Sequence, residues 1–323
     1  MIPGRLWFAG VSLAGSVLAI AQTAIAQEYP TKPISVYVPT IGSGADVLGR
    51  AYAPRLSATL GKQVLIVNRG GAGGVLAAET VAKAAPDGHS LLLYGPPIWL
   101  LPLLRANLSY DPVTDFAPIS TIASFPTVVV VHPSSPIKSI AELISTAKAR
   151  PGQLNSGSDT ASSAHLALEL FQSMAGINIT RVPYSGVGPA VTGLVAAQVD
   201  VVFPVTTVAA AHIKSGRLRA LAVGSAQPSP LTPGLPTVAA SGLPGYESVA
   251  WTALLAPAAT PGSIVNRLNQ EFDRLLKIQE IRDFMVNAGA EAVGSSPEAL
   301  AALIKAEMSK WGKIIKEAGI KEN

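Results

Sequence analysis

ISVYVPTIGSGADVLGRAYAPRLSATLG, residues 34–61, carries the pattern that decides the fold. Its first five residues, rich in β-branched and aromatic types, predict a strand, and residues 46–60 predict a helix that ends at Gly61. The alternation continues with predicted strands at 64–67, 90–94, 127–131 and 199–205, and helices at 75–85, 139–150, 163–175 and 187–197. Strands that alternate with helices predict an α/β protein whose parallel-rich sheets carry helices on both faces.

Composition limits the class of protein further. The chain has 323 residues, which is enough for about two domains. Only 14% of its residues are charged and 49% are hydrophobic, a balance that excludes an intrinsically disordered chain. The net charge of +4 is spread along the chain without a basic run, so nucleic acid is not expected as a partner. The absence of cysteine excludes disulfides, thiolate catalysis and cysteine-bound metals.

Residues 1–26 predict a signal peptide. A short segment with one positive charge, Arg5, precedes the apolar run 6–21, and Ala24-Ile25-Ala26 offers the small residues that signal peptidase requires. A retained membrane anchor is the alternative, but the run is short for a span that needs about 20 apolar residues. We therefore expect cleavage near Ala26-Gln27 and a mature protein exported to the periplasm. A long C-terminal stripe at 298–318 has helical spacing and predicts a core face.

Two loops that connect a strand to a helix are rich in small and hydroxyl-bearing residues and contain neither Lys nor Arg. The first includes Thr40, Ile41, Ser43, Gly44, Ala45 and Asp46, and the second, roughly 115 residues later, includes Ser158, Asp159, Thr160, Ser162 and Ser163. Small residues let backbone N–H groups approach a ligand, and a helix N-terminus favours an anion. Ordinary helix capping would also explain Ser, Thr and Asp here. Two such loops, one in each half, favour a pincer for a small carboxylate.

Catalytic motifs are scarce. The sequence has no Gly-x-Ser-x-Gly elbow and no phosphate-binding loop, and the glycine cluster 70–74 lacks the dinucleotide-binding order, which favours a structural turn. The four histidines are widely separated, and neither a cofactor nor a metal is expected. An exported hydrolase that uses Ser158 or Ser162 with His165 and Asp159 is the enzymatic alternative. It is disfavoured because catalytic partners usually come from distant segments.

Short motifs along the whole mature chain carry a family resemblance. They are YPTKPI (29–34), VNRGGAGG (67–74), APDGHSLL (85–92), DFAPI (115–119), PGQLNSGS (151–158), VPYSG (182–186), GRLRALAV (216–223) and GLPGYE (242–247). With these motifs in this order, the chain resembles the Bug (TctC-like) family, the periplasmic solute-binding proteins of the tripartite tricarboxylate transporter system.

The resemblance implies a type II periplasmic-binding-protein fold, in which two lobes joined by two crossovers close on a ligand. We expect one lobe over 27–125 and 246–323 and the other over 126–245. The implied carboxylate contacts are Thr40, Ser43, Gly44, Ala45 and Asp46 on one side and Ser158, Thr160, Ser162, Ser163 and His165 on the other, with Tyr184 near the cleft. The implied partners are a small carboxylate and, transiently, the subunits of a membrane permease, and we expect a monomer. Sensing on behalf of a two-component kinase is the alternative to transport.

The chain departs from the family pattern at several positions. Both loops are one residue shorter than usual, and Asp159 stands where a small residue is common. Pro204 replaces an acidic residue that can face the amino group of amino-acid ligands, which weakens the case for that ligand class. Trp99, after Pro96-Pro97, replaces a more polar stretch. Its indole either packs in the core or forms an aromatic wall for a flat or apolar ligand.

Overall fold

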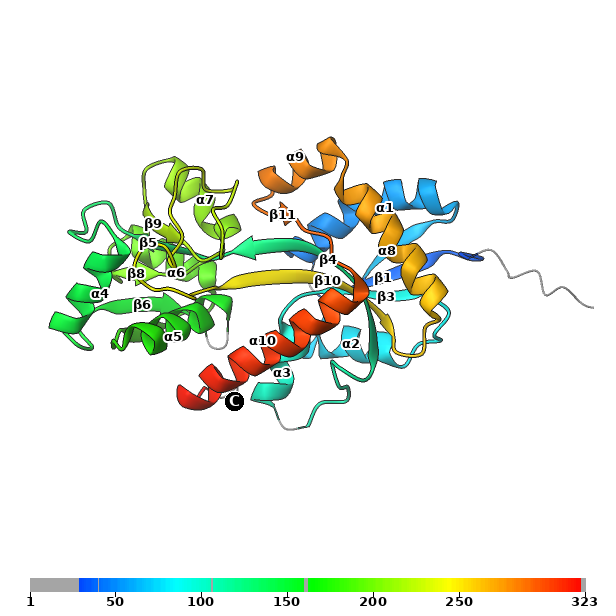
Figure 1. The fold of residues 1–323 in the computed structure, drawn as a ribbon, viewed down its shortest axis with the longest axis horizontal. Helices are drawn as coiled ribbons and strands as arrows, with labels where there is room; N and C mark the ends of the chain where they lie inside the picture. Colours follow the sequence, from blue (N-terminus) through cyan, green and yellow to red (C-terminus); the bar gives the residue numbers. More distant parts are fainter. Residues whose placement is uncertain (1–28, 40, 106, 160–161, 321–323) are drawn as a thin grey trace, which may run out of the picture.

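Two α/β lobes lie side by side, and each is built around one sheet (Figure 1). The computed structural model describes residues 29–39, 41–105, 107–159 and 162–320. The predicted signal peptide, Thr40 and Thr160 lie outside these residues. None of the helices in the described ranges has the length and apolar character needed to cross a bilayer.

The first lobe has a six-stranded sheet in the order β11-β4-β10-β3-β1-β2. Strand β1 pairs in parallel with β2 and β3, whereas β10 pairs antiparallel with β3 and β4 because the chain enters it from the other lobe. The strands are β1 (Ile34–Val38), β2 (Val64–Asn68), β3 (Ser90–Tyr94), β4 (Phe116–Pro126), β10 (Val249–Pro257) and β11 (Glu291–Ala292). The helices are α1 (Gly44–Leu60), α2 (Val75–Ala82), α3 (Pro97–Leu104), α8 (Gly262–Leu276) and α9 (Gln279–Asn287), with a 3₁₀ turn η1 (Ala72–Gly74).

The second lobe has a five-stranded sheet in the order β7-β6-β8-β5-β9. Its strands are β5 (Val128–Val131), β6 (Asn155–Ser158), β7 (Thr180–Pro183), β8 (Val201–Val202) and β9 (Arg219–Val223), and its helices are α4 (Ile140–Ala149), α5 (Ser163–Ala175), α6 (Val187–Val195) and α7 (Thr206–Lys214). The strand predicted over 199–205 is limited to Val201–Val202. The strand ends before Pro204, because proline has no N–H to donate to a neighbouring strand. The Pro204 carbonyl still accepts from the N–H of Val128 at 2.8 Å.

Local sequence signals account for several helix ends. Helix α1 ends before Gly61, whose φ of 68° lies in the left-handed region that glycine tolerates. The helix predicted over 139–150 is capped at its start, since the Ser139 hydroxyl accepts from the N–H of Glu142 at 3.1 Å. Helix α3 was not predicted because it contains Pro97 and Pro102. Its first proline occupies the start of the helix, where a missing N–H costs nothing.

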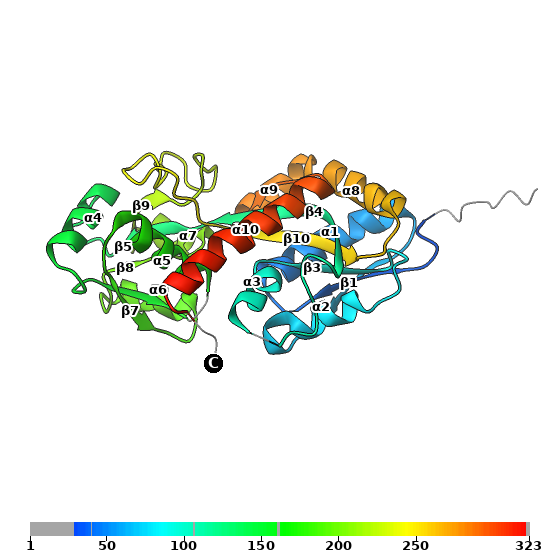
Figure 2. The same ribbon diagram turned by 60° about the horizontal axis from the view of Figure 1, so that its bottom comes forward.

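Helix α10 (Pro297–Glu317) runs diagonally from the first lobe onto the second (Figures 1 and 2). It contacts β4 and α3 in the first lobe and α5 in the second. Its predicted apolar stripe is a core face, with Leu300, Ile304, Trp311, Ile314 and Ile315 buried. One continuous hydrophobic cluster therefore extends through both lobes. A second cluster lies within the first lobe, and a third lies within the second lobe.

Two crossovers join the lobes and are bonded to each other. Strand β4 ends at Pro126 and β5 begins at Val128, so Thr127 alone separates the two sheets. Both the N–H and the hydroxyl of Thr127 donate to the carbonyl of Ser248 on the return crossover, at 3.1 and 3.0 Å. A Cβ on Gly224 would lie 2.4 Å from the Thr127 hydroxyl, so only glycine fits this junction.

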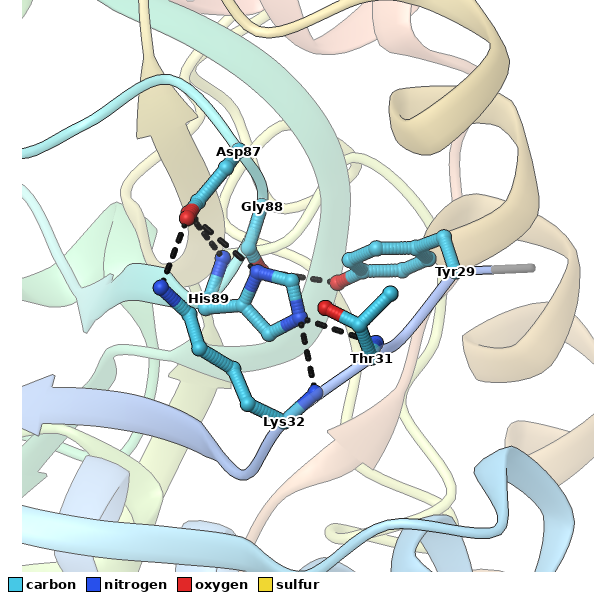
Figure 3. Close-up of polar contacts among 6 residues, drawn as sticks. All are labelled: Tyr29, Thr31, Lys32, Asp87, Gly88 and His89. Atoms are coloured by element: carbon cyan, nitrogen blue, oxygen red, sulfur yellow. Dashed lines mark hydrogen bonds and ion pairs between the residues drawn. The ribbon is translucent and has the colours of Figure 1, made fainter. Parts of the chain in front are cut away.

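The chain before β1 is held by the turn before β3 (Figure 3). The Tyr29 hydroxyl donates to the carbonyl of Gly88 at 2.7 Å, and Nε2 of His89 accepts from the N–H of Thr31 at 3.2 Å. Lys32 pairs with Asp87 at 2.8 Å. Burial by itself would raise the pKa of Asp87, but Lys32 and the N–H groups of His89 lower it to about 2. This cluster lies at the amino ends of β1 and β3, so the APDGHSLL motif has a structural role away from the carboxyl ends.

Candidate ligand-binding site

The loop between β1 and α1 is organised by Asp46. This carboxylate is buried, with an exposed fraction of 3%, and its two oxygens accept from different donors. Oδ1 accepts from Nδ2 of Asn68 at 2.8 Å and Nε of Arg50 at 3.1 Å, and Oδ2 accepts from the N–H of Gly42 at 2.9 Å. Burial favours the neutral acid, yet these hydrogen bonds outweigh it and lower the pKa of Asp46. Asp46 is therefore a positioning residue that fixes the loop.

Other residues of this loop take different places. Ser43 caps α1, since its hydroxyl accepts from the N–H of Asp46 at 3.3 Å. Ile41 is 77% exposed at the tip of the loop, and Ala45 is buried. A Cβ on Gly44 would lie 3.2 Å from the ring of Phe125, which is the residue before the end of β4. The loop thus lies beside the first crossover.

The loop between β6 and α5 carries polar groups at the carboxyl end of the second sheet. Ser162 caps α5: its hydroxyl accepts from the N–H of His165 at 3.2 Å and donates to the carbonyl of Asp159 at 3.1 Å. Ser158 is buried, and its Oγ has no hydrogen-bond partner among the residues that the structure describes. The same holds for Oδ1 of Asp159, which is also buried. Buried polar atoms of this kind call for a partner.

A pocket of about 390 Å³ lies between the lobes and includes this loop. The second lobe contributes Asp159, Ser162, Ser163 and Leu166. The first lobe contributes Gly73, the end of β3 and one side of α3 along its whole length. The return crossover adds Ser248, Val249 and Ala250, and α10 adds Glu307 and Trp311. The volume falls within the range of about 300–1,000 Å³ that small-molecule sites occupy.

The predicted site residues are only partly brought together. Asp159, Ser162 and Ser163 line the pocket. It is not lined by Ile41 and Ser43 of the β1–α1 loop, nor by Gly44, Ala45 and Asp46 in the first turn of α1. His165 is buried on α5 with Nε2 3.4 Å from Glu169. Pro204 is buried beside the first crossover.

Two aromatic residues that the sequence offered as site candidates, Trp99 and Tyr184, do not line this pocket. Trp99 is fully buried in the hydrophobic core, which is one of the two placements the sequence left open, so it does not form an aromatic wall. The Tyr184 ring packs against Gly157 and Gly193, where a Cβ on Gly193 would lie 2.3 Å from its hydroxyl. That hydroxyl donates to Gln198 at 3.4 Å. Tyr184 therefore packs against the second lobe's own core and does not line the pocket.

Most of the pocket wall was missed by sequence reasoning. It is formed by Tyr94, Pro96, Pro97, Leu100, Leu101 and Leu104 at the β3–α3 junction and by Glu307 and Trp311 on α10. The prolines at a strand end were one available signal. The other was Glu307, an acid four residues before Trp311 within an otherwise apolar helical stripe.

The polar groups of the first lobe and α10 are paired. The Tyr94 hydroxyl donates to the carbonyl of Gly73 at 2.9 Å, and burial raises its pKa to about 12. Nε1 of Trp311 donates to Glu307 at 2.6 Å, and Lys310 pairs with the same carboxylate at 2.6 Å. Among the described residues, no three His, Asp or Glu side chains are placed to hold a metal ion.

Two α/β lobes joined by paired crossovers, with a pocket between them at the carboxyl ends of strands, define a two-lobed solute-binding protein. The family model of the "Tripartite tricarboxylate transporter family receptor" matches residues 48–320. The chain belongs to this receptor family, as its motifs led us to expect. The family consists of solute receptors and not of enzymes, so the hydrolase alternative is wrong. Of the two serines that this alternative named, Ser158 and Ser162, the hydroxyl of Ser162 caps helix α5.

Named relatives agree with this assignment. BugT of Bordetella pertussis is 35% identical over 310 residues, which cover 94% of each chain. The structure of Rpa4515 from R. palustris, with adipate, is 37% identical with a TM-score of 0.76 and covers 91% of this chain and 99% of that one. MatC from Rhodopseudomonas palustris, with bound malate, is 31% identical with a TM-score of 0.70 and covers 89% and 100%.

Proposed function

We propose that the mature protein is a periplasmic receptor that binds a small carboxylate between its lobes and delivers it to a tripartite tricarboxylate-type permease. The observation that carries the proposal is the interlobe pocket at the N-terminus of α5, where Ser162 and Ser163 lie. A helix N-terminus supplies unpaired N–H groups and the positive end of the helix dipole, which stabilise a carboxylate without Lys or Arg. The related structures with adipate and malate support an organic acid as the ligand.

The lobes and the compartment belong to the same proposal. The first lobe takes residues 27–125 and 246–323, the second takes 126–245, and the chain acts as a monomer after cleavage near Ala26-Gln27. The β1–α1 loop would reach the carboxylate from the opposite side when the lobes close, a hinge motion for which the two crossovers are suited. His165, Tyr184 and Pro204 then act by supporting the second lobe.

A ligand screen tests this function. Mature protein, residues 27–323, is titrated by calorimetry with monocarboxylates, dicarboxylates, aromatic acids and amino acids, each beside its neutral amide. We expect at least one acid to bind and its amide to bind at least about tenfold more weakly, because only the carboxylate gains from the helix N-terminus. Absence of binding across the panel by folded protein would refute the proposal.

A pair of matched variants tests the site. Ser162→Ala removes the cap of α5 in the pocket, and Ser139→Ala removes the equivalent cap of α4, whose hydroxyl–N–H distance is similar. Each should lower the free energy of unfolding by about 1 kcal/mol. Only Ser162→Ala should weaken ligand binding; equal loss in both variants would place the site elsewhere.

A further inference from the structure

A second cavity, a groove of about 320 Å³ on the first lobe, is lined by three arginines. Arg55 comes from α1, and Arg267 and Arg274 come from α8, which packs against α1 (Figure 1). The two arginines of α8 are seven residues apart, so they lie on one face of that helix two turns from each other. None of the residues that line this arginine groove lines the interlobe pocket.

The arginine groove holds more positive charge than its own acids neutralise. Glu271 is the one acid among the described residues that line it, and its exposed fraction is 3%. Its Oε1 accepts from Nη1 of Arg274 at 2.9 Å and lies 3.4 Å from Nη2 of Arg267, so two guanidinium groups share one carboxylate oxygen. Arg55 pairs with Glu280 at the start of α9. Three cations therefore face two carboxylates.

The three guanidinium groups retain N–H donors for a further acceptor. Each has five N–H donors, and in the ion pairs between described residues each uses one nitrogen. The side chains of Arg55, Arg267 and Arg274 are 38%, 45% and 66% exposed, so an anion can approach them from solvent. Glu280 is 77% exposed, and an exposed ion pair of this kind contributes little to stability. A ligand can therefore compete with Glu280 for Arg55.

The N-terminus of α9 adds to the same electrostatic field. Ile278, which lines the arginine groove, is the N-cap residue of α9, and no side chain caps the helix at this position. The first N–H groups of a helix and the positive end of its dipole favour an anion. This contribution reinforces a field that the three arginines already establish.

We propose that the arginine groove binds a phosphate group, carried either by a free phosphate ion or by the headgroup of an anionic lipid. Planar guanidinium groups form paired hydrogen bonds with phosphate oxygens and stay charged at neutral pH. A phosphate has enough acceptor oxygens to engage arginines of both α1 and α8 while Glu271 keeps its own partners. The site differs from the interlobe pocket in place and in chemistry, so it does not depend on the proposed receptor function.

Two measurements on the mature protein, residues 27–323, distinguish the sources of the phosphate group. Calorimetry with sodium phosphate, beside sodium chloride at equal ionic strength, tests the free ion. Sedimentation with phosphatidylglycerol vesicles, beside phosphatidylcholine vesicles, tests the lipid headgroup. Saturable binding of phosphate assigns the free ion, and retention by the anionic vesicles alone assigns the headgroup. If folded protein binds neither, the inference is refuted, whereas the receptor proposal stands or falls on its own ligand screen.

Matched variants locate the binding. Arg267→Gln leaves Arg274 to hold Glu271, and Arg55→Gln removes the cation on the other helix. Each should weaken binding at least about tenfold, because each removes hydrogen bonds between charged groups. Arg217→Gln, which changes the net charge equally at an exposed arginine of the second lobe, is the control and should bind like wild type.

A further variant separates the guanidinium fork from its charge. Arg267→Lys should bind more weakly than wild type and more tightly than Arg267→Gln, since lysine keeps the charge without the paired donors. Circular dichroism checks that every variant is folded, and carboxylate binding in the interlobe pocket should be the same in all of them. Equal loss in Arg217→Gln and Arg267→Gln would show attraction to net charge only, and the arginine groove would then not be the site.

Discussion

Replacing Asp46 by Asn should release the β1–α1 loop and destabilise the protein. The side chains are isosteric, but Asn has one acceptor oxygen where Asp46 uses both. The amide oxygen can keep the two donors on the Oδ1 side, Asn68 and Arg50, and the amide NH₂ then faces the N–H of Gly42. One hydrogen bond to a charged group is lost, and such bonds contribute about 1.5–3 kcal/mol. We expect the free energy of unfolding to fall by about 2 kcal/mol at pH 7.

The effect has a defined pH dependence. The pKa of Asp46 is lower in the folded protein, so its ionised form stabilises the fold above the unfolded value of about 3.9. That contribution is lost as the pH falls through the lower folded value. The difference in stability between wild type and Asp46→Asn should therefore be full at pH 7 and diminish below about pH 4.

Urea denaturation followed by circular dichroism measures both quantities. Asp283→Asn, which changes an exposed acid that accepts from Gln279 at 2.8 Å, is the control and should change stability by less than about 0.5 kcal/mol. The variant should also bind the ligand more weakly, because Gly42 is no longer held. An Asp46→Asn protein as stable as wild type at pH 7, or a deficit that persists unchanged at low pH, would refute this account of the loop.

Three further predictions follow from single contacts. Gly74→Ala should lower the free energy of unfolding, measured by heat or urea, by about 2 kcal/mol, because φ is +100° and the new Cβ would lie 2.4 Å from the Tyr94 ring. Gly188→Ala, where a Cβ would meet no atom within 4 Å, is the control. Asp87→Asn should be less stable than wild type at neutral pH, and the gap should close as the pH falls from about 4 toward its pKa of about 2; a gap independent of pH would contradict the ion pair with Lys32. Glu307→Gln should lower the free energy of unfolding by about 1–3 kcal/mol, because the buried carboxylate binds Trp311 and Lys310 on the same helix. Glu317→Gln, which changes an exposed acid on α10, is the control and should leave stability unchanged.

Elements with strong local signals were predictable from sequence. Strand β3 and helix α5 have the predicted bounds, and α1 ends at the predicted glycine, because capping and left-handed turns depend on a few neighbouring residues. The 201–202 strand was predicted too long, since an apolar run alone does not show where a proline ends the ladder. Family membership was also predictable, because motifs spread over the whole chain carry it.

The sequence by itself determined the alternating α/β pattern, the two capped loops and the absence of basic residues from them. Only the tertiary structure decided which residues share a pocket. Pro96, Ser162, Ala250 and Trp311 are far apart in the chain, and they meet because two crossovers and the long α10 bring both lobes together. The same packing buries Trp99 and fixes Asp46 in its own loop. Local patterns encode caps and turns, but the neighbours of a side chain across an interface depend on how whole elements pack, which no short segment specifies.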